Sequence, residues 1–120
     1  MSKGARSVFV FGLYLAVLGI VLMVIPNFLL GMFFFPETNE VWIRVTGMLV
    51  LYLGSFYLLA ARKEMTDFFL WTVYFRSFVI VFFVIFVLLG FAGPPLILFG
   101  VIDLLGAIWT GLSLRSLDPA

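Results

Sequence analysis

Two charged residues stand alone in long apolar stretches, and they are the residues of this chain best suited to chemistry. Arg76 lies within the apolar run 68–91, and Asp103 lies within the run 94–114. A charge in the hydrocarbon of a bilayer costs roughly 2.5–3.5 kcal/mol on insertion scales, so each needs a partner or a wet cavity. Because the two charges have opposite signs and lie on consecutive runs, the sequence predicts a buried Arg76–Asp103 ion pair. The pair would act either as a structural staple or as part of a polar binding site.

The residue types that are missing exclude most catalytic chemistry. The chain has no cysteine and no histidine, which excludes thiol chemistry, a histidine general base and the usual metal ligands. A carboxylate paired with an arginine is held ionised and is a poor general base at neutral pH. We therefore expect a protein that is not an enzyme and that uses no cofactor.

The composition indicates an integral membrane protein. Of the 120 residues, 65% are hydrophobic and 11% are charged, whereas soluble domains carry about 25% charged residues. A soluble fold of this size has too little interior to hide so much apolar surface, so the excess must face lipid. There is no polybasic patch that would favour nucleic acid. The expected partner is membrane lipid.

Prolines and polar residues interrupt the apolar runs. Their positions predict an all-α fold, a single transmembrane four-helix bundle over residues 1–120. Pro26-Asn27 breaks the first run, and polar turns or prolines separate the others. Short connections favour up-down-up-down topology. The expected helices are about 8–25, 41–61, 67–90 and 94–114, with a short interfacial segment at about 28–35 and a tail at 116–120.

The charges near the helix ends predict an orientation. In an up-down bundle, five basic residues fall on one side and two acidic residues, Glu37 and Glu40, fall on the other. Short loops rich in lysine and arginine stay in the cytoplasm, so both termini are expected there. The basic residues are Lys3, Arg6, Arg62, Lys63 and Arg115.

Depth counting brings the two lone charges to a similar level. At 1.5 Å per residue, Arg76 lies about 14 Å and Asp103 about 18 Å from the inner ends of their helices. Small residues share the helical face of Asp103, which favours either close helix packing or room for a ligand. These small residues are Gly100, Gly106, Ala107, Thr110 and Gly111.

Three further residues complete the predicted polar centre. Thr72 lies four residues before Arg76 and can share its face, and Thr110 lies on the small-residue face. Arg44, one turn into its helix, is either a snorkelling arginine or part of an external gate. The 16 phenylalanines either face lipid or line an apolar cavity that suits a flat or polyisoprenoid ligand.

Several short segments resemble the DoxX-like group of small bacterial membrane proteins. The resemblance implies a four-helix bundle in the bacterial cytoplasmic (inner) membrane, and it assigns no catalytic residue. The segments are Pro26-Asn27, Trp42-Ile-Arg-Val-Thr-Gly47, Tyr57-Leu-Leu-Ala-Ala-Arg62, Thr72-Val-Tyr-Phe-Arg76 and Gly100-Val-Ile-Asp103.

Two functions remain open at this point. The first is a non-enzymatic protein that binds an apolar small molecule, such as a lipid or a quinone-like compound, or a partner membrane protein. The alternative is a small transporter or channel, which would need a homodimer because four helices can hardly enclose a pore alone. The glycine-rich face of the last helix is the predicted interface of that dimer.

Overall fold

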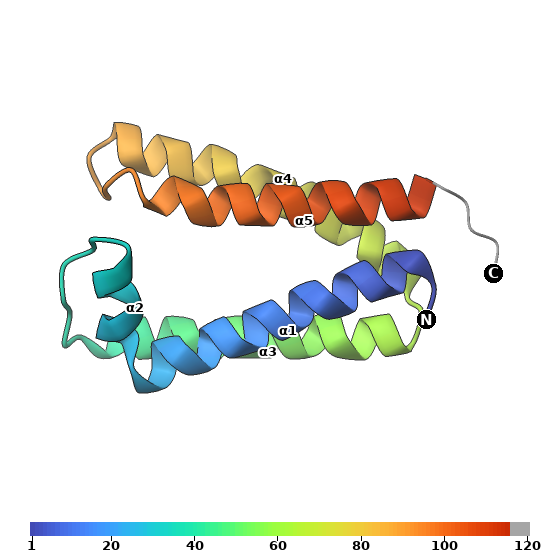
Figure 1. Cartoon of the computed structure of the whole chain (residues 1–120), viewed down its shortest axis with the longest axis horizontal. Coiled ribbons are helices and arrows are strands. Elements are labelled where there is room, and N and C mark those ends of the chain that lie inside the picture. Colours follow the sequence, from blue (N-terminus) through green and yellow to red (C-terminus); the bar gives the residue numbers. More distant parts are fainter. Residues whose placement is uncertain (116–120) are drawn as a thin grey trace.

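The computed structural model describes residues 1–115 and contains five helices over that range (Figure 1). Four of them are long and apolar enough to cross a membrane, which confirms the predicted all-helical fold with four membrane-length helices. The predicted tail 116–120 lies outside the described residues. The helices are α1 (Lys3–Val24), α2 (Pro26–Met32), α3 (Val41–Arg62), α4 (Thr66–Leu88) and α5 (Leu96–Arg115).

Helix α1 begins at Lys3, earlier than the predicted start at residue 8. Ser2 caps the helix, because its hydroxyl accepts a hydrogen bond from the backbone N–H of Ala5 at 3.1 Å. An N-cap of this kind satisfies one of the free N–H groups of the first turn. The charged residues Lys3 and Arg6 therefore lie inside the helix, and Ser7 lies in its second turn.

The other ends differ from the predictions by a few residues for local reasons. Gly90 adopts a left-handed conformation with φ of +81°, and the N–H of Phe91 donates to the carbonyl of Phe86 at 2.9 Å. This Schellman motif ends α4 at Leu88. Pro94 and Pro95 form the turn that precedes α5, so the helix begins at Leu96.

The segment after the Pro26-Asn27 break is a short helix that folds back on the bundle. α2 has proline at its first position, where the missing N–H costs nothing. The side chain of Asn27 fixes the following loop, accepting from the N–H of Thr38 at 2.9 Å and donating to its carbonyl at 3.2 Å. The rings of Phe33 and Phe99 lie 4.7 Å apart, which ties the loop to α5.

The long helices form two antiparallel pairs, α1 with α3 and α4 with α5 (Figure 1). In the first pair, Gly12 faces Gly54 and Gly19 faces Gly47, so the two backbones are in direct contact. A Cβ atom added to Gly19 would lie 2.5 Å from the backbone nitrogen of Leu51. We call these four facing glycines the glycine seam. Small residues of this kind let helices approach closely in lipid.

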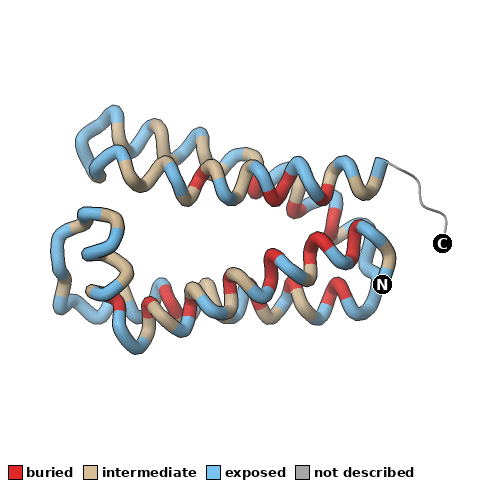
Figure 2. Tube along the Cα trace, viewed as in Figure 1, coloured by how far each residue is buried: buried red, intermediate tan, exposed pale blue. Residues whose placement is uncertain are grey.

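The two pairs meet at one end of the molecule, which we call the joined end. It holds the start of α1 and the end of α5, where Gly4 lies against the side chain of Leu114. The buried residues of α4 and α5 concentrate toward this end, and α2 lies at the opposite, open end (Figure 2). The buried core, which includes Val8 and Phe69, therefore lies in the joined half of the bundle.

A polar contact also links the start of α1 to the end of α3 at the joined end. Glu64 follows α3 in a left-handed conformation, with φ of +53°. Its carboxylate accepts from the hydroxyl of Ser2 at 2.7 Å and from the backbone N–H of Ser2 at 2.8 Å. These hydrogen bonds hold the pKa of the Glu64 carboxyl below its ordinary value.

Candidate functional site

Arg76 is buried in the joined half of the bundle, with 3% of its surface exposed. One terminal nitrogen, Nη2, donates to the hydroxyl of Thr72 at 3.0 Å and to the hydroxyl of Thr110 at 2.8 Å. The Nε–H donates to the backbone carbonyl of Thr72 at 3.3 Å. The guanidinium is thus held by neutral oxygen atoms from α4 and α5.

The hydrogen bonds continue from Thr110 to the first helix. The hydroxyls of Thr110 and Ser7 lie 2.8 Å apart, and Ser7 donates to the carbonyl of Gly4 at 2.7 Å. Since the single proton of Ser7 goes to Gly4, Thr110 must donate to Ser7, which leaves the Thr110 oxygen free to accept from Arg76. We call Ser7, Thr72, Arg76 and Thr110 the polar chain. It joins α1, α4 and α5.

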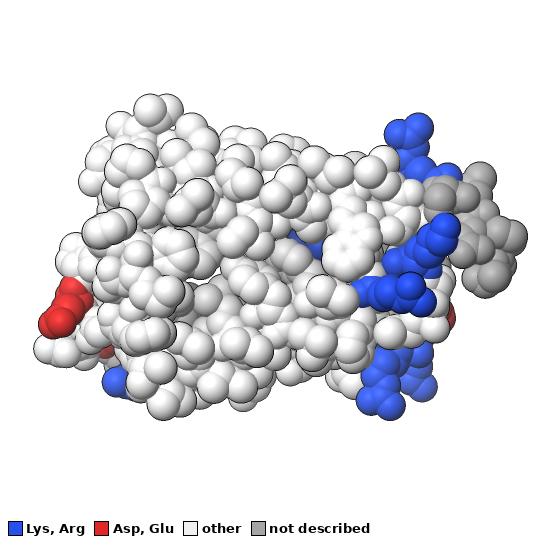
Figure 3. Space-filling view, in the orientation of Figure 1, with Lys and Arg blue, Asp and Glu red and all other residues white. Residues whose placement is uncertain are grey.

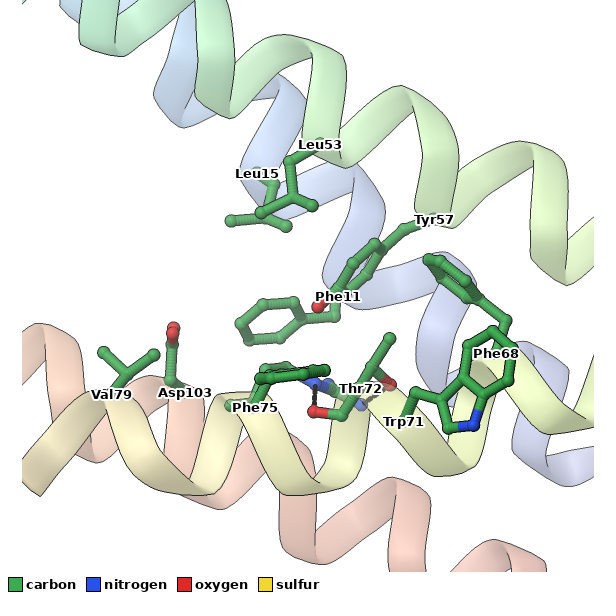
Figure 4. Close-up of a pocket in the computed structure, with 11 residues that line it drawn as sticks. Phe11, Leu15, Leu53, Tyr57, Phe68, Trp71, Thr72, Phe75, Val79 and Asp103 are labelled. Carbon is green, nitrogen blue, oxygen red and sulfur yellow. Dashed lines mark hydrogen bonds between the residues drawn. The ribbon is translucent and has the colours of Figure 1, made fainter.

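Two aromatic rings lie against the guanidinium. The Cζ atom of Arg76 lies 4.7 Å from the ring centre of Phe11 and 5.6 Å from that of Tyr57. Both distances suit cation–π attraction, which strengthens where water is excluded. Figure 4 shows Phe11 and Tyr57 reaching this position from α1 and α3, so all four long helices contribute to the surroundings of Arg76.

One donor of Arg76 is left without a partner. The Nη1 atom is buried and makes no hydrogen bond to any residue that the structure describes. It lies beside Gly106, where an added Cβ would be 3.1 Å from Nη1 and 2.7 Å from the Phe11 ring. A buried, unpaired donor is costly, particularly on a charged group. The site therefore holds a fixed positive charge, and both N–H groups of Nη1 are still free to donate.

The predicted ion pair between Arg76 and Asp103 is not formed among residues 1–115, because the guanidinium bonds to the two threonines instead. The reason is the direction of the side chains. In a helix the Cα–Cβ bond tilts toward the N-terminus. α4 and α5 are antiparallel, so Arg76 leans toward the joined end while Asp103 leans toward the open end. Asp103 is half-buried and has no hydrogen-bond partner in the described part of the chain.

Both charges nevertheless line one cavity between the helix pairs. Its volume is about 300 Å³, and it is walled by residues of all four long helices, Arg76 and Asp103 among them (Figure 4). A second cavity of about 430 Å³ continues toward the open end, and Asp103 lines it as well. We call the two together the interpair cleft. The residues that line both cavities are Leu15, Leu53, Val79 and Asp103.

The walls of the cleft are almost entirely apolar. At the open end α2 and its loop cover the second cavity with Leu29, Leu30 and Phe35. Aromatic rings line much of the remainder, so part of the phenylalanine content faces this cleft and not only lipid. The seven phenylalanines in the walls are Phe11, Phe35, Phe68, Phe75, Phe82, Phe83 and Phe99.

The five residues of the predicted polar centre separate into two groups. Thr72 and Thr110 hold Arg76 directly, and Asp103 shares a cavity with it. Arg44 is elsewhere: its Nη1 donates to the carbonyls of Met23 and Val24, the latter at 3.4 Å. It thereby satisfies free carbonyls at the end of α1, where the chain breaks before Pro26.

The small-residue face of α5 is used for packing inside the chain. An added Cβ on Gly100 would lie 2.9 Å from the backbone of Ile80 in α4, and Gly106 lies against Phe11 of α1. A Cβ added to Gly111 would lie 3.7 Å from Val73 of α4, an ordinary contact distance. The close-packing interpretation of this face is confirmed.

Sequence reasoning missed Ser7, Phe11 and Tyr57. The predicted helix start at residue 8 left Ser7 just before the helix, and Tyr57 is one hydroxyl among several in an apolar background. The usable signal was the cap at Ser2. A helix starting at Lys3 places Ser7 and Phe11 on one face, four residues apart.

Comparisons with known proteins add no further evidence about the site. No protein-family model, curated protein or solved structure matches this chain.

Proposed function

We propose that this protein binds an apolar small molecule, a lipid or a quinone-like compound, in the interpair cleft, and that it is not an enzyme. The observation that carries the proposal is the cleft itself: apolar walls from all four long helices, with Arg76 and Asp103 as its charged groups. Ligand pockets typically combine apolar walls with a few well-placed polar groups, and they begin at about 300 Å³.

The aromatic walls favour a flat or long apolar molecule. The rings of Phe82, Phe83 and Phe99 line the larger cavity, and Trp71 and Phe75 line the smaller one. Aromatic side chains offer large, stiff contact surfaces to such a ligand. Trp71 and Phe75 are also exposed on the outside of the molecule, where lipid would surround them. A ligand dissolved in the bilayer would thus enter from the side.

The proposal includes an orientation in the membrane. Most lysines and arginines gather at the joined end (Figure 3), where Glu64 and Asp67 also lie, whereas the open end carries Glu37 and Glu40 with one arginine, Arg44. By the positive-inside rule the joined end would face the cytoplasm. Together with up-down-up-down topology and the resemblance to the DoxX-like group, this favours the bacterial inner membrane with both termini cytoplasmic.

The alternatives are a partner membrane protein seated in the cleft and a homo-oligomeric transporter or channel. The glycine face of α5 was the expected dimer interface, but Gly100 and Gly106 pack against α4 and α1. A dimer would need another surface, so a small ligand is the better-supported occupant.

The test is to fill the cleft without changing a charge. Val79 lines both cavities, so Val79→Phe should displace the ligand. Val81, on the same helix, is 48% exposed and lines neither cavity, so Val81→Phe is the matched control. Native mass spectrometry of protein extracted from bacterial membranes should show a small apolar adduct on the parent chain and on the control, and little on Val79→Phe.

Two results would contradict the proposal. One is a parent protein that carries no apolar adduct, lipid included. The other is an equal adduct on Val79→Phe and Val81→Phe. A co-purified second polypeptide lost only from Val79→Phe would instead support a protein partner.

A further inference from the structure

We propose that the interpair cleft selects a neutral apolar molecule that carries a hydroxyl group, a lipid alcohol, over molecules of equal length with a charged head. This inference rests on the proposed binding function and specifies the ligand class. Its basis is that Arg76 and Asp103 line one cavity, that the buried Nη1 of Arg76 has no hydrogen-bond partner among residues 1–115, and that the Asp103 carboxylate accepts no hydrogen bond there.

Arg76 supplies the first requirement, a hydrogen-bond acceptor on the ligand. Its Nη2 and Nε atoms are engaged by the threonines, whereas Nη1 has no partner among residues 1–115. The guanidinium cannot turn away, because Thr72 and Thr110 fix it. The Phe11 ring stacks against the guanidinium and also lines the cavity. Because Nη1 is buried beside this ring and Gly106, the proposal requires the Phe11 ring to move when the ligand binds.

Asp103 supplies the second requirement, a hydrogen-bond donor on the ligand. Its carboxylate accepts no hydrogen bond from the described residues, and it lies where the two cavities meet. An ionised carboxylate can only accept. A ligand that offers only acceptors, such as an ester, would satisfy Arg76 and leave Asp103 unpaired.

The two charges together exclude a charged head group. A fatty-acid carboxylate would pair with Arg76 but would share an apolar cavity with Asp103, and an amine would meet Arg76 in the same way. Like charges in a site from which water is excluded repel strongly. A hydroxyl both donates and accepts without bringing a charge. It is the simplest uncharged head group that can both donate and accept a hydrogen bond.

The experiment compares three compounds that share one alkyl chain length and differ in their head groups. Dodecanol, dodecanoate and dodecylamine, each brominated at the same chain position, quench a nearby tryptophan. Trp71 lines the cavity and is also exposed to lipid, so the protein is used as Trp42→Phe/Trp109→Phe, which retains Trp71 alone. Quenching that persists when Val79→Phe is added is subtracted as contact from the bilayer. In nanodiscs of neutral lipid, we expect dodecanol to quench Trp71 with a midpoint at least about tenfold lower than either charged compound, given the cost of like charges in contact.

Asp103→Asn is the decisive variant, because it removes the negative charge and keeps the size of the side chain. Dodecanoate should then bind about tenfold more tightly, and the preference for dodecanol over dodecanoate should disappear. Asp67→Asn removes an exposed acidic residue at the start of α4, outside the cleft, and should leave the preference unchanged.

The outcomes separate this inference from the proposed function. Equal quenching by all three heads, or tightest binding of dodecanoate, would overturn the selectivity and leave an apolar binding site. An unchanged preference in Asp103→Asn would also overturn it. If none of the three compounds quenches Trp71 more strongly with Val79 than with Val79→Phe, the proposed binding function itself fails.

Discussion

The glycine seam between α1 and α3 joins two helices through their backbones, whereas the polar chain joins α1, α4 and α5 through side chains. At the seam, Gly19 and Gly47 lie so close that neither has room for a Cβ atom. At the polar chain, Arg76 keeps an unpaired donor beside a cavity. In lipid there is no hydrophobic force between helices, so close packing and hydrogen bonds must do this work. The molecule uses the first for a tight pair and the second beside the interpair cleft.

The largest expected effect comes from breaking the seam. In Gly19→Ala the new Cβ would lie 2.5 Å from the backbone nitrogen of Leu51 and 2.6 Å from the carbonyl of Gly47. Because both contacts are backbone atoms, the helices must move apart. We expect a loss of about 1–3 kcal/mol, the usual range for overpacking. Thermal unfolding in detergent, followed by circular dichroism, measures it.

Gly31→Ala is the matched control for this substitution. Gly31 lies in α2 with no atom within 4 Å of an added Cβ. Alanine is also the better helix former by about 1 kcal/mol, so this variant should unfold at the same temperature as the parent or slightly higher. Equal melting of Gly19→Ala and Gly31→Ala would show that the seam is not tightly packed.

The second effect comes from the polar chain. Thr110→Val keeps the shape of the side chain but removes the acceptor of Arg76 and the donor to Ser7. An unpaired buried polar group costs about 1–3 kcal/mol, so we expect a similar loss of stability. Thr110→Ser retains the hydroxyl and should lose much less. A similar melting temperature for the two variants would place the role of Thr110 in packing and not in hydrogen bonding.

The smallest effect is the pH dependence of the contact between Ser2 and Glu64, which holds α1 to α3 at the joined end. The hydrogen bonds from Ser2 lower the pKa of the folded Glu64 carboxyl below its ordinary value of 4.5. A lowered pKa stabilises the folded state above the unfolded pKa, and this stability is lost as the pH falls through the folded pKa. Glu64→Gln should therefore weaken the acid-induced drop in melting temperature below pH 4.5.

Glu37→Gln, at the open end, controls for the loss of an exposed acidic residue. In this variant the melting temperature should fall with decreasing pH as it does in the parent chain. If Glu64→Gln shows the same acid-induced drop in melting temperature as the parent chain, the contact with Ser2 contributes nothing measurable to stability. That result is common for exposed polar contacts.

The sequence predicted the number of membrane-length helices, and it placed Thr72 and Thr110 in the polar centre, although it gave Asp103 as the partner of Arg76. Long apolar runs between polar breaks locate helices reliably, and the spacing of Thr72 and Arg76 placed them on one face. Thr110 came from its position on the small-residue face of Asp103. These predictions depend only on the repeat of a single helix.

Whether Arg76 and Asp103 form an ion pair could not be predicted from the repeat of a single helix. Depth counting uses Cα positions, which are at similar levels, but the side chains of antiparallel helices lean in opposite directions. The choice of neutral threonines as partners of Arg76 depends on how helices rotate toward one another. The pairing of Gly12 with Gly54, and of Gly19 with Gly47, likewise exists only once the helices are assembled.

The polar chain has a consequence for how the protein enters the membrane. When α4 is made, its arginine has an acceptor only on its own helix, at Thr72. The acceptor at Thr110 arrives with α5, and Ser7 is already present on α1. An arginine alone in hydrocarbon is strongly disfavoured. We therefore expect α4 to integrate poorly by itself and to partition stably only once α5 has emerged, so that the last two helices enter the bilayer as one hairpin.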